Sequence, residues 1–372
     1  QKYFMPSLYI HIPFCRKKCL YCDFCSMDYE SRLAEDYIDV LCRQIEDLEV
    51  RFSSIYIGGG TPSVLDARLL AKLLKAMKRL VNPGIEFTVE ANPESLKEDI
   101  LDVLKINGVN RLSIGIQSLN NNKLKNLGRI HDAQAASQAV SLAKKSGFDN
   151  ISIDLIFGLW DEELEAWKQD LKEVVSLPVR HISAYGLTYE KDTPLFKAKE
   201  NGEIKPLDNE LAGRMYEYAM DYLEGEGFKQ YEVSNFSQDG FSCRHNLNYW
   251  ENNEYLGLGP SAVSYISGAR RENIADTIEY IRKADDNQSL NASCEQLAPS
   301  ARARETAAVK IRTSRGIDFK WFKEKTGFDF PDLEAVALPK LTDAGLISYN
   351  KGDICLTKNG FLFADTVSSE FI

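Results

Sequence analysis

The sequence predicts an α/β fold in which a partial (β/α)6 barrel is followed by a small C-terminal winged-helix-like α+β domain. Three observations favour this fold. Short apolar or β-branched runs alternate with amphipathic stretches between residues 8 and 188, as in β-α units on a parallel sheet. Several of these runs end in residues that a structural turn does not require, such as "GGGTPS" and "VEANPES". The chain closes with helical patterns and a β-hairpin pattern.

Each of the six expected strands is a short run rich in β-branched and apolar residues. They cover residues 8–12, 54–60, 86–92, 111–118, 150–158 and 181–188. Helical patterns with apolar residues at i, i+3 and i+4 lie between them at 67–80, 94–108 and 133–147, and the last two end in glycine. Because chemistry in such barrels sits at the carboxyl ends of the strands, we expect one shared site at that end of the sheet.

The regularity fades after residue 190. A long helical pattern at 209–228 is followed by a stretch rich in aromatic and Asn residues at 231–262, and the polar stretch at 284–303 indicates a domain boundary. Helices are then expected at 302–312, 318–326 and 332–344, with a hairpin at 346–357. The expected division is a barrel core at 1–190, a barrel-closing or ligand-binding extension at 191–290, and a winged-helix-like domain at 291–372.

Composition limits the class of protein. Of the 372 residues, 27% are charged, 44% are hydrophobic and the formal net charge is -10. There is no apolar run close to the roughly 20 residues that span a bilayer, and the start does not resemble a signal peptide. We therefore expect a cytoplasmic protein. The acidic balance and the lack of a Lys/Arg block argue against nucleic acid as a partner.

Four cysteines, Cys15, Cys19, Cys22 and Cys25, follow the first expected strand at C-x3-C-x2-C-x2-C spacing, and the other four are scattered singly. Thiolates this close can wrap one iron-sulfur cluster. With Cys15, Cys19 and Cys22 as metal ligands, a [4Fe-4S] cubane keeps one iron open for the amino and carboxylate groups of S-adenosylmethionine. Structural zinc completed by Cys25 is the alternative, although such sites usually split their ligands into two separated pairs. A redox disulfide is a third reading.

A larger set of motifs gives a family resemblance. "YIHIPFCRKKCLYCDF", "YIGGGTPS", "VEANPES", "RLSIGIQS", "LGRIH", "IDLIFGL" and "HNLNYW" together resemble the radical S-adenosylmethionine superfamily. Within it, they are similar to the oxygen-independent coproporphyrinogen III oxidase family and its HemW-type heme chaperones. The resemblance covers roughly residues 6–350 and implies that the predicted fold is a partial barrel of the radical S-adenosylmethionine type.

The resemblance also implies roles for individual residues. Tyr9 and Tyr21 should line the S-adenosylmethionine pocket, and Gly60 and Thr61 should contact the methionine end, where a glycine lets the backbone approach a ligand. Polar groups of the cofactor should be bound by Glu90, Gln117, Arg129 and Asp154. Taken one at a time, each of these four polar side chains could simply be solvated or paired with a neighbour. Together, however, they are expected at the ends of neighbouring strands.

"HNLNYW" contains His245, one of four histidines. Imidazole is a common axial ligand of heme iron, and the family associates this segment with heme binding in the chaperone branch. The alternative is that the aromatic segment closes the barrel over the cofactor. His245 is therefore a heme-binding candidate, with heme as cargo.

Two departures separate the branches. The decarboxylating oxidases have a fourth cysteine two residues after the third, where this chain has Phe24, and they have a longer segment before the cysteines. We therefore expect a heme chaperone that delivers heme to an acceptor protein, with peripheral membrane contact as one option. Coproporphyrinogen III oxidase, which decarboxylates propionate side chains, is the alternative, and a radical enzyme acting on tRNA is disfavoured. The sequence leaves open whether a radical is used, and the oligomeric state.

Overall fold

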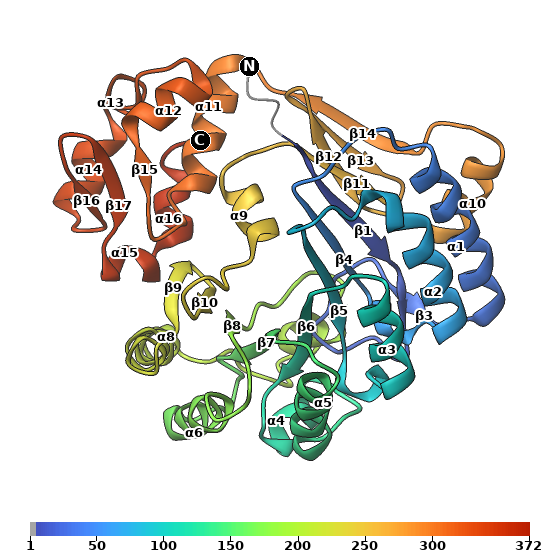
Figure 1. Ribbon diagram of the computed structural model, residues 1–372. Coiled ribbons are helices and arrows are strands. Elements are labelled where there is room, and N and C mark those ends of the chain that lie inside the picture. The colour runs from blue at the N-terminus through green and yellow to red at the C-terminus, as the bar shows by residue number, and fades with distance from the viewer. Residues whose placement is uncertain (1–4) are drawn as a thin grey trace.

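A computed structural model describes residues 5–372, so the first four residues of the expected barrel core lie outside it. Its main feature is a curved twelve-stranded sheet, seen in Figure 1 with helices packed along its outer side. In spatial order the strands are β14 (Asn291–Gln296), β13 (Ala269–Asn273), β12 (Val263–Ile266), β11 (Tyr255–Leu258), β1 (Ser7–Ile12), β4 (Ser54–Gly59), β5 (Glu86–Ala91), β6 (Arg111–Gln117), β7 (Asn150–Phe157), β8 (His181–Gly186), β10 (Asn235–Ser237) and β9 (Lys229–Glu232).

The six strands predicted from the sequence are β1, β4, β5, β6, β7 and β8, and they lie side by side in chain order. Each pairs in parallel with the next, with Leu8 opposite Ile55 and Ser152 opposite His181 as examples of the register. The parallel order follows from the helical crossovers between the strands. The predicted α/β partial barrel is confirmed.

Later segments extend this sheet at both edges. β11 pairs in parallel with β1, and β12, β13 and β14 continue antiparallel beyond it. At the other edge β10 pairs antiparallel with β8 and with β9. The sheet takes in β14, which follows the boundary expected at residue 290, because its backbone completes the ladder of β13.

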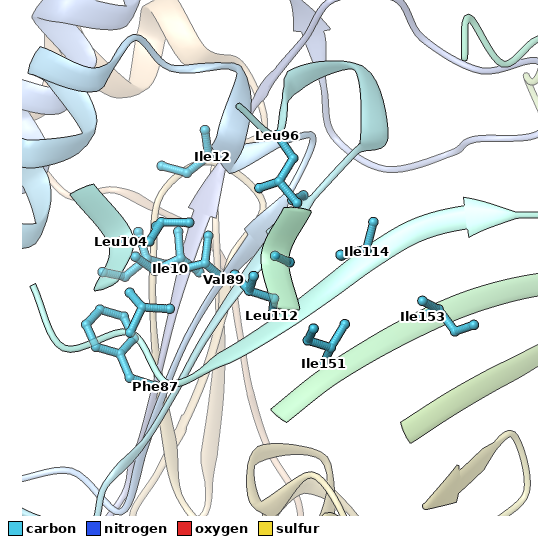
Figure 2. Close-up of a cluster of buried hydrophobic side chains, with 14 of the residues drawn as sticks. Ile10, Ile12, Phe87, Val89, Leu96, Leu104, Leu112, Ile114, Ile151 and Ile153 are labelled. Atoms are coloured by element: carbon cyan, nitrogen blue, oxygen red, sulfur yellow. The ribbon is translucent and has the colours of Figure 1, made fainter. Parts of the chain in front are cut away.

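Helices cover the outer face of the sheet because that face is apolar. Figure 2 shows how Ile10, Val89, Leu112 and Ile153 of four strands point toward the same layer as Leu104 of α3. Side chains on a strand alternate between two faces, so the intervening residues face inward. The helices of this part of the chain are α1 (Ser31–Glu46), α2 (Ala67–Ala76), α3 (Glu98–Ile106), α4 (Asn121–Asn126), α5 (Ala133–Lys145), α6 (Leu164–Val174), α7 (Pro194–Glu200), α8 (Asn209–Gly225), α9 (Arg244–Trp250) and α10 (Thr277–Asp285).

Side-chain caps set where several helices begin. Asp66 accepts a hydrogen bond from Leu69 N at the start of α2, and Asp132 accepts one from Ala135 N at the start of α5. The helix expected at 94–108 begins only at Glu98, because Pro93–Ser95 form a separate 3-10 turn. Sequence periodicity therefore predicted that these helices exist, but it did not predict where each of them begins.

The C-terminal part is a small α+β domain with its own core, which includes Phe322, Phe330 and Phe371. The helix expected at 332–344 is divided into Phe330–Leu333 and Ala337–Asp343. Between them lies Glu334, whose carboxylate accepts a hydrogen bond from Arg304 at 3.0 Å. The elements are α11 (Pro299–Lys310), β15 (Ile317–Asp318), α12 (Phe319–Thr326), α13 (Phe330–Leu333), α14 (Ala337–Asp343), β16 (Ile347–Tyr349), β17 (Asp353–Leu356), α15 (Lys358–Leu362) and α16 (Ala364–Ser369). β16 and β17 form the expected hairpin.

A search of residues 5–372 finds no helix with the length and apolar character needed to cross a membrane.

Candidate functional site

The inner face of the sheet is polar, in contrast to the outer one. Along β6, Arg111, Ser113, Gly115 and Gln117 alternate with buried Leu112, Ile114 and Ile116. The same alternation gives β4, β5, β7 and β8 an inner row of polar or small side chains, namely Ser54, Tyr56, Gly58, Glu86, Thr88, Glu90, Ser152, Asp154, His181 and Ser183. The apolar face of the sheet packs against the helices, and the face with these polar and small side chains is free to form one wall of a binding site.

One cavity of about 1380 Å³ occupies the inner side. The cysteine loop lines one end of it, and at the other end it reaches α8 and the start of the C-terminal helices α15 and α16. Pockets for a single drug-sized ligand span about 300–1,000 Å³, so this cavity has room for more than one small molecule. Of the residues predicted from the sequence, it is lined by Cys15, Cys19, Cys22, Tyr21, Gly60, Thr61, Glu90, Gln117, Arg129 and Asp154.

The three predicted thiol ligands lie together at the end of the cavity where the strands terminate. Cys15 ends the short strand β2 (Phe14–Cys15), which pairs with β3 (Met27–Asp28) and closes the loop that carries Cys19 and Cys22. Burial raises the pKa of the Cys15 thiol and raises the pKa of the Cys22 thiol to about 11. Because metals bind the thiolate, a cluster would have to displace these protons when it binds.

Cys25 is directed away from the other three. Its thiol donates to the carbonyl of Ala275, with a distance of 3.2 Å between Sγ and O, and it lines a second cavity of about 410 Å³. No group of three or more His, Cys, Asp or Glu side chains within residues 5–372 is arranged to hold a single metal ion. The donor set at the end of the main cavity is therefore three thiols, which fits the three-cysteine cluster better than a four-thiolate zinc site.

Arg129 connects the cysteine loop to the sheet. Its Nη1 lies 3.4 Å from Cys19 Sγ and 3.3 Å from Asn92 Oδ1, and its Nη2 donates to Gly115 O at 2.7 Å. Gln117, the last residue of β6, has a φ of 64°, in the left-handed region that costs a non-glycine residue about 1–2 kcal/mol. Such strain is often found at binding sites, where it aims a side chain.

Two acids lie on the inner face below this end. Burial raises the pKa of the Glu90 carboxyl to about 7, although hydrogen bonds from Tyr56 Oη at 2.7 Å and Gly59 N at 3.2 Å lower it. Burial also raises the pKa of Asp154, against hydrogen bonds from Ser183 and Ser113 and the charge of Arg111. Glu90 therefore keeps its proton to a higher pH than an exposed glutamate does.

The glycine run fits tightly around the first strand. A Cβ on Gly60 would stand 2.7 Å from Phe14 O and 3.0 Å from Ile12 O, so this position needs a residue without a side chain. Thr61 accepts a hydrogen bond from Asn92 Nδ2 at 2.8 Å, and its Oγ1 lies 3.5 Å from Cys15 Sγ. The motif thus holds the cysteine loop against the sheet as well as lining the cavity.

Tyr9 is the one predicted cofactor residue that lines the second cavity and not the first. Its neighbours there include Tyr249, Tyr255 and Cys25. Glu90 and Gly59 line both cavities, so the two are adjoining parts of one site.

His245, on α9, is 1% exposed and lines neither cavity. Its Nδ1 is 2.9 Å from Ser54 Oγ and its Nε2 is 3.0 Å from Tyr249 Oη. Burial, aided by the nearby Arg111 charge, lowers the pKa of His245 to about 3. The other histidines are arranged in the same way, since both ring nitrogens of His11, His131 and His181 are also hydrogen-bonded.

Several cavity residues were not predicted from the sequence. Asn92 and Gly115 stand inside the quoted motifs "VEANPES" and "RLSIGIQS", and Tyr56 is two residues before the glycine run. Arg111 begins the fourth predicted strand. Alternation along each strand was the signal that could have found them, because every second residue from Gln117 or Glu90 faces the same side.

Comparison with known proteins places the chain among relatives. Residues 9–174 match the radical SAM superfamily, and residues 297–363 match the HemN C-terminal domain. The "Heme chaperone HemW" of Lactococcus lactis is 35% identical over 369 residues, which are 98% of this chain and 97% of that protein. The "Heme chaperone HemW" of Bacillus subtilis is 33% identical over 99% of both chains.

The solved structure of coproporphyrinogen III oxidase from Escherichia coli has the same fold. It superposes with a TM-score of 0.86 over 99% of this chain and 90% of that chain, at 23% sequence identity.

Proposed function

Because the chain belongs to the HemW heme-chaperone family of the radical SAM superfamily, we propose that it binds heme beside a [4Fe-4S] cluster and S-adenosylmethionine and passes the heme to an acceptor protein. The family predicted from the motifs is confirmed by the relatives that match over nearly the whole chain. The single observation that carries the proposal is the likeness over 98% of this chain to a relative named a heme chaperone.

The residues at the thiol end fit the two cofactors. Cys15, Cys19 and Cys22 supply three thiols on one cavity wall, and an open iron of a three-cysteine cluster accepts amino and carboxylate groups. Arg129 suits a carboxylate, and the acids Glu90 and Asp154 suit hydroxyl groups or an ammonium. When bound, the cluster and S-adenosylmethionine would supply one-electron chemistry, and the residues of the chain would bind and orient them and shield them from water.

The size of the cavity supports a cargo besides the cofactors. About 1380 Å³ extends from the thiols to α8 and to the C-terminal residues around Phe361 and Phe363. Phe363 is 50% exposed at this opening, and Tyr185 is 41% exposed and lines the cavity. Aromatic rings suit the flat face of a tetrapyrrole.

The oxidase reading has less support. Phe24, at the position of the oxidases' fourth cysteine, is 61% exposed and lines both cavities. The resemblance to the oxidase structure lies below 25% identity, so it supports the fold alone. Decarboxylation is therefore the outcome that the first experiment must exclude.

His245 remains part of the proposal, with a condition set by its surroundings. A metal would have to take the place of Tyr249 Oη at Nε2, or of Ser54 Oγ at Nδ1. We therefore propose that heme ligation by His245 requires α9 to shift away from β4.

The experiment is an anaerobic heme titration of reconstituted protein, followed by visible absorbance, for wild type, His245→Ala and Tyr249→Phe. Ligation by His245 predicts at least a tenfold weaker binding and a changed Soret band for His245→Ala. Tyr249→Phe removes the competing hydrogen bond and is expected to bind heme at least as tightly as wild type. A parallel reaction with coproporphyrinogen III, S-adenosylmethionine and reductant monitors decarboxylation.

Absence of heme binding by wild type would contradict the chaperone proposal, and formation of protoporphyrinogen would restore the oxidase. Heme binding that survives His245→Ala with an unchanged spectrum would remove His245 as a ligand but keep the chaperone. Delivery is tested separately by the transfer of heme from loaded protein to an apo-hemoprotein.

A further inference from the structure

We propose that Arg111, at the start of β6 in the wall of the main cavity, is an anion subsite that binds a carboxylate of the cargo, as on a propionate-bearing tetrapyrrole. This inference rests on the proposed function and deepens it by naming the chemical group that orients the cargo. Nothing in the sequence motifs assigns a ligand to Arg111.

The first observation is a buried cation with no bonded partner. Arg111 is 1% exposed and is among the largest fully buried side chains of the protein. It lines the main cavity from the inner face of β6. Its Nε is buried without a hydrogen-bond partner, and no group within residues 5–372 accepts a hydrogen bond from its guanidinium or forms an ion pair with it.

The second observation is that the neighbouring anions are engaged elsewhere. Glu86 accepts hydrogen bonds from Arg244 N and His245 N, both at 3.0 Å, and its nearest ion-pair partner is Arg244 at 3.9 Å. Asp154 accepts from Ser113 Oγ at 3.4 Å. A guanidinium is always charged in proteins and presents a fork of donors, and a buried charge is costly unless it is paired. Burial lowers the pKa of Arg111 and nearby charges, including that of Glu86, raise it, but no group within residues 5–372 accepts from the guanidinium, so its donors are free for an anion that enters the cavity.

The shape of the guanidinium points to a carboxylate. A carboxylate accepts two parallel hydrogen bonds from a guanidinium, which adds geometric specificity to the charge. Tyr185 is 41% exposed and lines the same cavity, so its ring offers a flat surface, whereas the Tyr56 ring is already stacked on His245, with 5.0 Å between the ring centroids. An aromatic molecule with carboxylate arms suits both the exposed ring and the guanidinium.

Position along β6 distinguishes the cargo from the cofactor. Arg111 begins the strand, whereas Gln117 ends it near the thiols. With about 3.3 Å of rise per residue, the two ends lie roughly 20 Å apart. A carboxylate that chelates an iron held by Cys15, Cys19 and Cys22 cannot also reach Arg111. Arg129, 3.4 Å from Cys19, is the cation at the cofactor end.

The other buried or half-buried cations of the cavity have partners. Arg312 forms an ion pair with Asp365 and lies over the ring of Trp250, 5.4 Å from its centroid. Arg129 bonds to Gly115 O and Asn92 Oδ1. Lys17 and Arg214 also line the cavity, but both are exposed to solvent. Among the buried lining cations of residues 5–372, Arg111 is therefore the one that has no bonded partner.

The test compares ligands first and variants second, in cluster-loaded protein. Iron protoporphyrin IX and its dimethyl ester are titrated into wild type, and the free acid into Arg111→Met, Arg111→Lys and the exposed control Arg271→Met. S-adenosylmethionine affinity is measured for each. We expect the ester, and the free acid with Arg111→Met, to bind about 10- to 100-fold more weakly, the loss of a charge-assisted hydrogen-bond pair. Arg111→Lys should fall between, and Arg271→Met should match wild type.

The comparison of acid and ester on wild type needs no variant, so a misfolded Arg111→Met protein cannot leave the inference untested. Equal affinity for acid and ester, or a normal heme affinity in a folded Arg111→Met protein, overturns the inference while the chaperone proposal stands. A loss of S-adenosylmethionine affinity alone in Arg111→Met would assign the subsite to the cofactor and overturn it as well. If wild type binds no heme, the proposed function fails and the inference fails with it.

Discussion

Two buried cations of the protein are held in opposite ways. Lys123, on α4, is 6% exposed and is fully paired: its Nζ lies 2.5 Å from Glu162 Oε1 and 3.2 Å from Asp170 Oδ2. Arg111, on the inner face of β6, forms no hydrogen bond or ion pair within the described residues. The first cation stabilises the fold beside the cysteine loop, whereas the second keeps its donors free on the cavity wall.

The thiol end also has structural support from several elements. Leu20, inside the cysteine loop, donates from its backbone N to Leu127 O just after α4, and its own carbonyl accepts from Leu195 N of α7. Glu162 accepts from Gly158 N and Leu159 N in the loop after β7. A surface held by this many hydrogen bonds keeps its shape without a ligand.

The largest expected effect concerns the cysteines. Cys19→Ser should abolish the cluster, because it removes one of three thiols at the cavity end, while Cys25→Ser should retain it, because the Cys25 thiol is bonded to Ala275 O. Iron content and brown absorbance near 400 nm measure both after anaerobic reconstitution. Loss of the cluster in both variants would point to a four-thiolate site and break the distinction between Cys25 and the other three.

Buried charge gives the next effect. Lys123→Met should lower the free energy of unfolding by about 3–5 kcal/mol, because it leaves Glu162 and Asp170 buried without their cation. Arg111→Met should lower it by less than Lys123→Met does, about 1–2 kcal/mol, because it removes a cation that acts on Asp154 and Glu86 through charge alone and breaks no hydrogen bond or ion pair. Denaturant titrations of both proteins without heme provide the comparison. Similar losses would show that the two cations do not differ in how they are held.

The acid beneath the thiol end predicts a pH effect. The folded-state pKa of Glu90 is about 7, above its ordinary value of 4.5. The folded protein therefore holds this proton more tightly than the unfolded chain, so the stability that Glu90 contributes is fully present below pH 4.5 and is lost as the pH rises toward and through 7. Glu90→Gln should remove this pH-dependent loss of stability, which is on the order of 3 kcal/mol or less.

The measurement compares the melting temperatures of cofactor-free wild type and Glu90→Gln between pH 4.5 and 8. The difference between the two proteins at each pH isolates Glu90, because both contain the same other acids. Parallel curves would mean that Glu90 is ionised throughout this range and that its burial is less complete than the structure shows.

The smallest expected effect is steric. Gly60→Ala should destabilise the protein by about 1–3 kcal/mol, because its Cβ would press on Phe14 O and Ile12 O beside the cysteine loop. Gly352→Ala, where a Cβ meets no atom within 4 Å, is the matched control. Gly60→Ala should lower both the melting temperature and the affinity for S-adenosylmethionine. Gly352→Ala should change neither.

Much of the molecule followed from the sequence alone. Six strands and their parallel order were predicted because apolar runs and helical patterns alternate at regular intervals, and a parallel sheet is the arrangement that buries both. Short motifs placed Cys15 and Glu90 near strand ends, and parallel strands bring their carboxyl ends to one edge. Arg129, expected at a strand end, lies instead in the loop between α4 and α5 and reaches Gly115 O of β6 through its side chain. Local spacing therefore determined the thiol end of the cavity.

Other features were decided only by the tertiary structure. The pairing of β11 with β1 joins residues about 250 positions apart, and no local pattern encodes it. The surroundings of His245 depend on Ser54 and Tyr249 from different elements, so its motif predicted importance but not that both nitrogens are bonded. Arg111 has no hydrogen-bond or ion-pair partner because of how the side chains from several elements pack around it, which its own motif does not determine. Short motifs identified the cysteines and several of the polar residues that line the cavity, because those depend on local spacing. Packing decided the rest of the lining and which side chains have partners, because both depend on contacts between elements far apart in the chain.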